Sequence, residues 1–118
     1  MTEYLIAFNS EWVPDITDEE LRRRGEAVRT LREEMREAGV LIYTNGLDED
    51  APAFSVDASS GTPLFTDGAY VESKEHLGGF ALVTVADEEE ARLWAGKVAV
   101  ACGWPQEVHR FQVHMQRS

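Results

Sequence analysis

The chain has little of several features that would decide its class at once. Its 118 residues include a single cysteine, Cys102, so no disulfide forms within one copy. The spacing of the three histidines matches no metal-binding motif, and neither a glycine-rich phosphate loop nor a nucleophile elbow occurs. We therefore expect neither a metal ion nor another cofactor.

Basic charge is also scarce. The sequence has 11 lysines and arginines against 22 aspartates and glutamates, which gives a formal net charge of −11. Phosphate backbones and anionic membrane surfaces repel such a chain. No charged leader followed by an apolar segment and a cleavage site opens the sequence. We predict a cytoplasmic protein that binds neither nucleic acid nor a membrane.

The remaining composition is that of an ordinary folded protein, with 43% hydrophobic and 28% charged residues. A chain of this length can bury one real core and has little left for a second. We predict a single domain over residues 1–118.

Apolar residues at helical spacing predict two helices. The first begins at Thr17, whose spacing to Glu20 is that of a capping box, so that each side chain is expected to bond the other's backbone amide. Gly39 supplies its stop. The second begins at Asp87, a capping residue, and ends at Gly103.

Three consecutive arginines, residues 22–24, lie in the first helix. They form either an anion-binding patch or a salt-bridged, solvated face. Glu19 precedes Arg23 by four residues and Glu20 precedes Arg24 by four, which is the favourable order for helical ion pairs. The interleaved charges favour the salt-bridged face.

Short apolar or alternating runs predict the strands. They lie at residues 4–8, 40–44, 53–57, 62–66, 80–85 and 107–115. A turn-rich interval separates the third from the fourth, so these two form a hairpin arm. The order predicts an α+β, ferredoxin-like β-α-β-β-α-β fold with both helices on one face of an antiparallel sheet.

Three of the predicted strands, 4–8, 40–44 and 80–85, are apolar on both faces. Two helices cover only one face, so something outside the domain must cover the other. A second copy is the simplest cover, because a two-fold pair makes each open face complementary to the other. We predict a homodimer whose two sheets enclose a barrel-like interior.

The stretch from Phe65 to Val85 combines most of the candidate chemistry with an apolar strand. Its first part reads Asp67-Gly68-Ala69-Tyr70-Val71-Glu72-Ser73-Lys74-Glu75, and Leu77-Gly78-Gly79-Phe80 follows. This run resembles the signature of YCII-related proteins of the DGPF type, Asp-Gly-Pro-Phe-Ala-Glu-Thr-Lys-Glu followed by a Gly-Gly strand. Ala69 stands where that family has proline, and Tyr70 where it has phenylalanine.

The resemblance implies a dimeric α+β barrel, in a superfamily that includes muconolactone isomerase-like proteins and cofactor-free monooxygenases. Related YCII proteins have been suggested to carry a His/Asp pocket, but most members have no assigned reaction. Genes of the DGPF type often lie beside genes for extracytoplasmic-function sigma factors. The family resemblance therefore implies a fold without supplying a function.

The same stretch offers a candidate small-molecule site. Asp67 is expected to act as a base, because partial burial at a cavity mouth raises the pKa of a carboxylate. His76 is expected to act as a proton relay, because an imidazole exchanges protons near neutral pH. Lys74 would steady an anion. The further expected substrate contacts are Gly68, Tyr70 and Glu75.

A purely structural interpretation of these residues is also open. Asp67 then bonds backbone amides in an Asx turn before Gly68, and Lys74 pairs with Glu72 or Glu75. The pair Gly78-Gly79 lets two backbones approach closely.

Two functions follow from these alternatives. The first is an enzyme that performs proton transfer or isomerisation on an aromatic or carbonyl compound. It requires a partly apolar pocket where ionisable groups converge. The alternative is a non-catalytic regulatory or binding protein associated with a sigma factor, which requires an exposed apolar or acidic patch.

Overall fold

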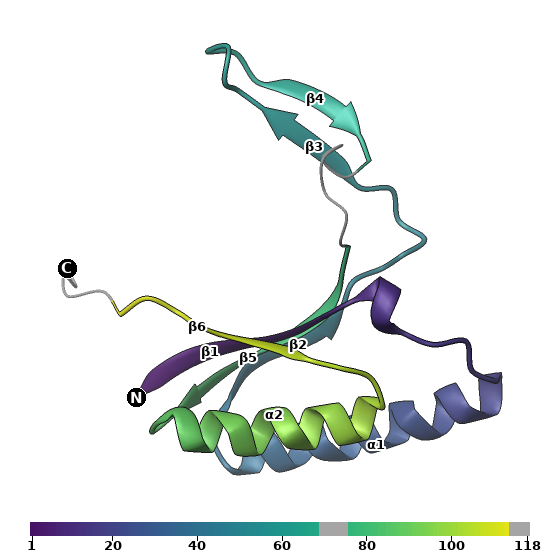
Figure 1. Cartoon of the computed structure of the whole chain (residues 1–118), viewed down its shortest axis with the longest axis vertical. Helices are drawn as coiled ribbons and strands as arrows, with labels where there is room; N and C mark the ends of the chain where they lie inside the picture. Colours follow the sequence, from purple (N-terminus) through teal and green to yellow (C-terminus); the bar gives the residue numbers. More distant parts are fainter. Residues whose placement is uncertain (69–75, 114–118) are drawn as a thin grey trace.

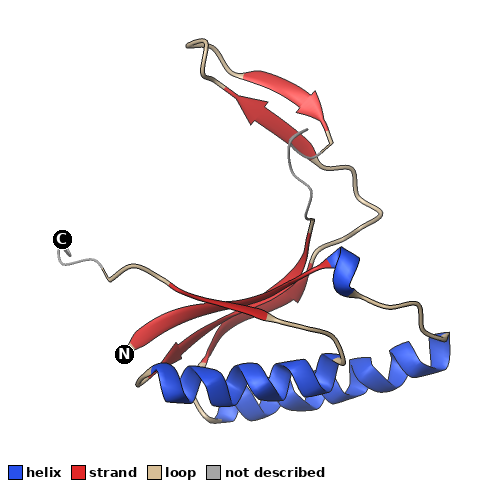
Figure 2. Ribbon diagram, viewed as in Figure 1, coloured by secondary structure: helices blue, strands red, loops and turns tan. Residues whose placement is uncertain are grey.

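One antiparallel sheet with both helices on the same face forms the body of the protein. The computed structural model describes residues 1–68 and 76–113, and in them four strands pair in the order β2-β5-β1-β6. Figures 1 and 2 show the two helices side by side beneath this sheet. The strands are β1 (Thr2–Asn9), β2 (Leu41–Gly46), β5 (Leu77–Val85) and β6 (Glu107–Arg110). The helices are α1 (Asp18–Glu37), α2 (Glu88–Cys102) and the short 3-10 helix η1 (Ser10–Trp12).

The succession β1-α1-β2-β5-α2-β6 is the ferredoxin-like pattern, with neighbouring strands antiparallel throughout the sheet. The predicted α+β fold is therefore confirmed. In the described part of one chain the sheet ends at β2 and β6 and does not close into a barrel. The last strand is shorter than the predicted 107–115: residues 111–113 lie outside β6, and the final positions lie outside the described residues.

Both helices begin at the predicted capping residues, but neither forms the full capping box, because the glutamate three residues after the cap does not bond the amide of the capping residue itself. Thr17 Oγ1 accepts from the amide of Glu20 at 3.1 Å, yet the Glu20 carboxylate bonds arginines instead of reaching back. At α2, Asp87 accepts from the amide of Glu90 at 2.9 Å, and the Glu90 carboxylate accepts from the amide of Ala86 at 2.7 Å.

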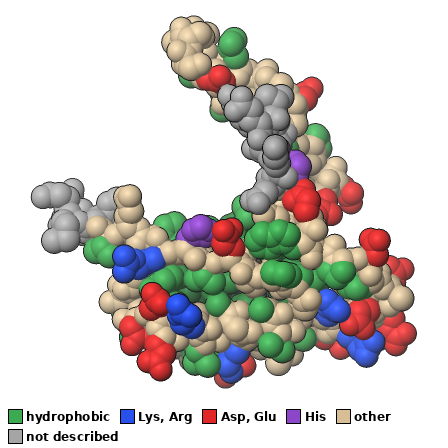
Figure 3. All heavy atoms as spheres, in the orientation of Figure 1, with side chains coloured by type: hydrophobic (Ala, Val, Ile, Leu, Met, Phe, Trp, Pro, Cys, Tyr) green, Lys and Arg blue, Asp and Glu red, His purple; other side chains and the backbone are tan. Residues whose placement is uncertain are grey.

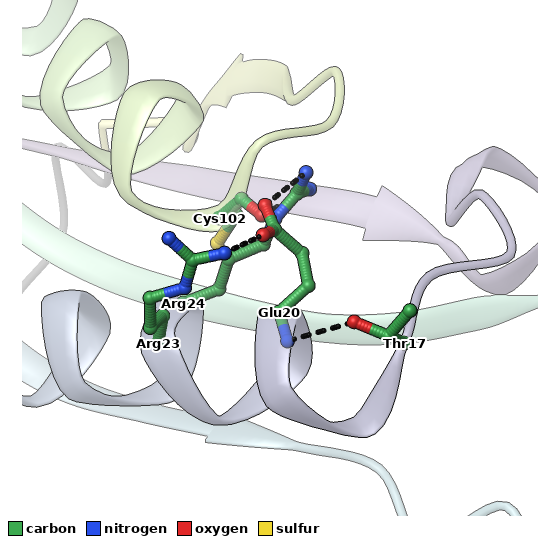
Figure 4. Close-up of polar contacts among 5 residues, drawn as sticks. All are labelled: Thr17, Glu20, Arg23, Arg24 and Cys102. Carbon is green, nitrogen blue, oxygen red and sulfur yellow. Dashed lines mark hydrogen bonds and ion pairs between the residues drawn. The ribbon is translucent and has the colours of Figure 1, made fainter.

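The arginines of α1 form the predicted salt-bridged face. Arg22 pairs with Glu26 at 2.9 Å, while Arg23 and Arg24 share Glu20 at 2.6 and 3.1 Å (Figure 4). The expected pairing of Arg23 with the glutamate at position 19 is wrong. Glu20, three residues before Arg23, forms ion pairs with both Arg23 and Arg24. Arg24 also donates to the carbonyl of Cys102 at 3.2 Å, which ties α1 to the end of α2. This arrangement is a structural clamp.

The core lies between the sheet and the helices. Cross-strand partners share a face, and the pairs Tyr4–Val83 and Ile6–Ala81 face the helices. The buried core consists of Tyr4, Ile6, Leu31, Met35, Val40, Ala81, Val83, Val85, Ala91, Trp94 and Ala95.

The opposite face of the sheet is apolar as well, and neither α1 nor α2 lies on it. Leu5 pairs with Leu82, and Ala7 pairs with Phe80, on this side of β1 and β5. Tyr43 of β2 adds its ring next to Phe80, with 6.1 Å between the ring centroids. We call Leu5, Ala7, Tyr43, Phe80 and Leu82 the open face.

The hairpin arm consists of β3 (Phe54–Asp57) and β4 (Leu64–Asp67), which form a separate two-stranded sheet. Figure 1 shows the arm standing away from the main sheet, on the side opposite the helices. Phe54 and Phe65 lie 6.2 Å apart between ring centroids, and each is 69% exposed. Hydrophobic side chains are visible at the surface of the arm in Figure 3. An isolated hairpin is only marginally stable in water, so the arm needs a packing partner.

Candidate functional site

A carboxylate and an imidazole meet at the base of the hairpin arm, where β1 ends and β5 begins. Glu11 lies in η1, the turn after β1, and His76 directly precedes β5. His76 Nδ1 lies 2.5 Å from Glu11 Oε2, and the His76 amide donates to Glu11 Oε1 at 3.0 Å. Ser10 holds the other side of the His76 backbone, because its amide and hydroxyl both donate to the His76 carbonyl, at 2.8 and 3.0 Å. Three hydrogen bonds at the main chain therefore fix the imidazole's attachment point.

The electrostatics of this pair favour an ionised Glu11. The hydrogen bond from the His76 backbone amide, followed by the bond from its ring, lowers the pKa of the Glu11 carboxyl below its ordinary value. A neutral imidazole that donates from Nδ1 to this carboxylate presents its lone pair at Nε2. Both side chains are about half exposed, at 52% for His76 and 48% for Glu11.

The Gly-Gly pair after His76 makes room for an aromatic ring. A Cβ on Gly78 would lie 2.6 Å from Phe8 Cε2, and one on Gly79 would lie 2.9 Å from Phe8 Cε1 and 3.1 Å from the Cα of Gly46. Real Cβ atoms do not come this close. The expected close backbone approach at the pair is confirmed, and the ring of Phe8 is what occupies the space.

The sequence-predicted site residues are spread over two places. Asp67 is exposed at the end of β4 on the arm, and Gly68 follows with a left-handed φ of 90°. Gly68 is held by its amide, which donates to Ala53 O at 2.8 Å, and by its carbonyl, which accepts from Ser55 Oγ at 2.7 Å. His76 lies at the arm base with Glu11 as its partner. The remaining candidates, Tyr70, Lys74 and Glu75, lie outside the described residues.

Sequence reasoning missed Glu11. It is a single carboxylate in a short polar turn, 65 residues away from His76, with no motif around it. The signal is in the register: Asn9 pairs with Leu77, which brings Ser10 level with His76 and places Glu11 one residue further along the turn. Only the pairing of β1 with β5 reveals this contact.

A separate apolar cavity of about 230 Å³ lies between the sheet and the helices. Glu11, Asp67 and His76 do not line it. Its walls come from the core side of β1, α1, β2, β5 and α2 and from the segment after α2. The lining residues include Ile6, Phe8, Leu31, Met35, Val98, Cys102 and Trp104.

Within residues 1–68 and 76–113, no three His, Cys, Asp or Glu side chains are grouped so that they could hold a metal ion. His109 of β6 lies 3.4 Å from Glu107, an exposed contact on the edge strand. The described helices include none long and apolar enough to cross a membrane.

Comparison with known proteins shows the family of the chain. The family model of the YCII-related domain matches residues 5–102, from β1 to the end of α2. The chain belongs to the YCII-related family. No curated protein matches the sequence.

Proposed function

We propose that the protein is an enzyme that transfers a proton on a small aromatic or carbonyl compound. The observation that supports this proposal is the Glu11–His76 pair, in which a carboxylate orients a half-exposed imidazole. A positioned imidazole is the commonest general base, because its pKa range suits reversible proton transfer near neutral pH.

In this proposal His76 Nε2 takes a proton from the carbon next to a carbonyl group and returns it at the same or another position. The Glu11 carboxylate holds the ring and stabilises the imidazolium that forms after proton abstraction. Asp67 was expected to be the base, but its place on the exposed arm suits a second proton donor or a purely structural turn. Lys74 keeps its proposed role of steadying the anion.

We further propose that a second copy closes the site. The arm and the open face lie on the same side of the sheet, opposite the helices, and the Glu11–His76 pair lies where the arm leaves the sheet (Figure 1). A partner sheet laid on the open face would exclude water from that side, which strengthens hydrogen bonds to a developing charge. The homodimer is thus part of the proposed site.

Solvent deuterium provides a test that does not require the natural substrate. Aromatic keto acids, with phenylpyruvate as the first member, are incubated with the protein in D2O, and NMR follows deuterium entry next to the carbonyl. We expect incorporation faster than in buffer, and a loss of about 10²–10⁴-fold of that acceleration in His76→Asn. Glu11→Gln should retain part of it. If no compound in the series exchanges faster with wild type than with His76→Asn, the proposal fails.

Asp67→Asn is the matched comparison, because it removes a charge from the arm while keeping the side chain's shape. A second catalytic group would lose exchange activity with little change in melting temperature. A turn-forming Asp67 would instead lose about 0.5–2 kcal/mol of stability, as capping residues do, and retain the activity. The two measurements together assign its role.

The alternative function is a regulatory or binding protein that associates with a sigma factor. The exposed apolar arm, with Phe54 and Phe65 at its surface, favours this alternative because such patches mark interaction sites. Deuterium exchange that is absent in wild type, together with an arm that remains exposed in the dimer, would support it. Both functions suit the cytoplasm, where a free thiol such as Cys102 stays reduced.

A further inference from the structure

The cavity between the sheet and the helices combines apolar walls with one charged side chain. Among the described residues that line it, Arg32 is the one charged residue, and none is an aspartate or a glutamate. The cavity volume of about 230 Å³ exceeds the roughly 150 Å³ that suffices to bind benzene in an apolar protein cavity. It is below the several hundred Å³ of typical drug-sized pockets. The space therefore suits a single ring with one small substituent.

Arg32 lies on the face of α1 that forms a wall of this cavity. Val28, Leu31 and Met35 of the same helix line the cavity too. Residues three, four and seven positions apart share one face of a helix, and Arg32 continues this spacing from Val28. Its side chain is half-buried, whereas Leu31 and Met35 are buried. The charge of Arg32 is thus attached at the cavity wall and not on the outer face of α1.

Arg32 forms no ion pair with the residues that the structure describes. Arg22, Arg24 and Arg36 of the same helix each pair with a glutamate three or four residues away. Helical ion pairs form at these spacings. The positions three and four residues from Arg32 hold Val28, Arg29, Met35 and Arg36. The sequence therefore gives Arg32 no acidic partner within its own helix.

A guanidinium at the wall of an apolar cavity favours an anion inside it. A charge that is partly removed from water is costly unless an opposite charge or hydrogen-bond acceptors compensate it. A carboxylate provides both, because its two oxygens accept two parallel N–H bonds from the planar guanidinium. The apolar side chains Ile6, Met35 and Val98 form other parts of the wall and suit an uncharged ring. One molecule that carries a ring and a carboxylate would satisfy both parts of the cavity.

We propose that this cavity binds a carboxylic acid with a single aromatic ring, whose carboxylate pairs with Arg32. The ring lies among the apolar side chains of the sheet and the two helices. This site goes beyond the proposed function, because neither Glu11 nor His76 lines the cavity.

Benzoate is the probe, and benzamide is its matched control, because the two compounds have nearly the same shape and differ in charge. Ligand-observed NMR measures the affinity of the protein for each. We expect wild type to bind benzoate about tenfold more tightly than benzamide, since hydrogen bonds between charged groups are stronger than those to a neutral group. If neither compound binds wild type, or if both bind equally, the proposal is overturned.

Two substitutions of one kind in α1 test whether Arg32 is the partner. Arg32→Gln removes the guanidinium, so the ratio of the two affinities should fall to about one. Arg29→Gln removes the same charge from an exposed position of the same helix that does not line the cavity, and it should leave the ratio unchanged. Circular dichroism verifies that both variants keep their helices. If the two variants change the ratio equally, the proposal is overturned.

The position of the ring is tested in wild type, without a substitution in the cavity. Met35 lines the cavity, whereas Met1 is 84% exposed. In protein with isotope-labelled methionine methyl groups, the ring current of bound benzoate should shift the NMR signal of Met35 and leave that of Met1 in place. Met35→Leu assigns the signal. A Met35 signal that does not move at saturating benzoate overturns the proposal.

The same probe separates this proposal from the proposed function. His76→Asn should bind benzoate as wild type does, while the deuterium exchange described above should be lost in it. Benzoate binding at Arg32 without any exchange activity would contradict only the enzyme. Exchange activity in a protein whose Met35 signal does not respond to benzoate would contradict only the cavity site.

Discussion

The two faces of the four-stranded sheet are built from the same strands but have different surroundings. On the covered face, Ile6 is 1% exposed and Val83 is fully buried under the helices. On the open face, Leu5 and Leu82 alternate with them along β1 and β5 and are only partly buried. An apolar strand therefore does not indicate by itself what covers it. The covered face explains why the chain folds, and the open face, with the arm above it, shows where the folded chain has surface left for a partner or ligand.

Replacing one residue from each face tests this contrast most strongly. Ile6→Ala should reduce the free energy of unfolding by about 2–5 kcal/mol, because it leaves a cavity in a packed core. Its effect should not depend on protein concentration. Leu5→Ala should destabilise less. In the proposed dimer Leu5 contacts the second copy, so the effect of this substitution should grow with protein concentration. Urea unfolding at several protein concentrations measures both effects. If both substitutions reduce the free energy of unfolding equally at every protein concentration, the two faces do not differ in the way proposed.

The glycines at the arm base give a second, smaller effect. Gly78→Ala should destabilise by about 1–3 kcal/mol, because the new methyl group meets the Phe8 ring at 2.6 Å. Gly25→Ala is the matched control: nothing lies within 4 Å of its added Cβ, and in the interior of α1 alanine should stabilise by about 0.5–1 kcal/mol. Thermal unfolding compares the two, and a neutral Gly78→Ala would show that Phe8 is not packed on the pair.

The thiol at the end of α2 reports on the covered side. Burial raises the pKa of Cys102, and the nearby charge of Arg24 offsets only part of this effect. We expect iodoacetamide to alkylate Cys102 more slowly in the folded protein than in urea at the same pH. Arg24→Gln should slow the folded reaction further, because it removes the positive charge that favours the thiolate. Alkylation at the unfolded rate would show that the covered side is open.

The smallest expected effect concerns the Glu11–His76 pair at acid pH. Because the folded-state pKa of Glu11 is lowered, its contribution to stability is present above the unfolded pKa and is lost as the pH falls through the folded pKa. Glu11→Gln should therefore be less stable than wild type at neutral pH and equal to it in strong acid. Urea midpoints of the two proteins across this range measure the difference. A difference that does not change with pH would exclude the ionised carboxylate as its source.

Local patterns predicted the elements and the ends of both helices, whereas most strand ends differ by one to five residues from the predicted ones. Thr17 and Asp87 cap their helices, and the left-handed Gly39 and Gly103 end them, because such signals act within a few residues. The exact side-chain pairs were harder to predict. Glu20 bonds two arginines rather than the Thr17 amide, since several partners compete for one carboxylate and spacing alone does not rank them.

The candidate site was predictable only in part. His76 and the space beside Gly78 were visible in one continuous stretch of sequence. Glu11 was not, because its contact depends on the β1–β5 register and on a turn that follows β1. The cavity was equally hidden, since its walls come from five separate elements. Contacts between distant segments are set by tertiary packing, which a single sequence does not display.

The account as a whole depends on the open face being covered by a second copy, and the mass of the protein in solution tests this most directly. Light scattering at micromolar concentration should give twice the chain mass of 13.2 kDa. Leu82→Glu places a charge in the middle of the open face and should reduce the mass to that of one chain while the helical circular dichroism remains. A wild-type protein that stays soluble at the mass of a single chain would contradict the account.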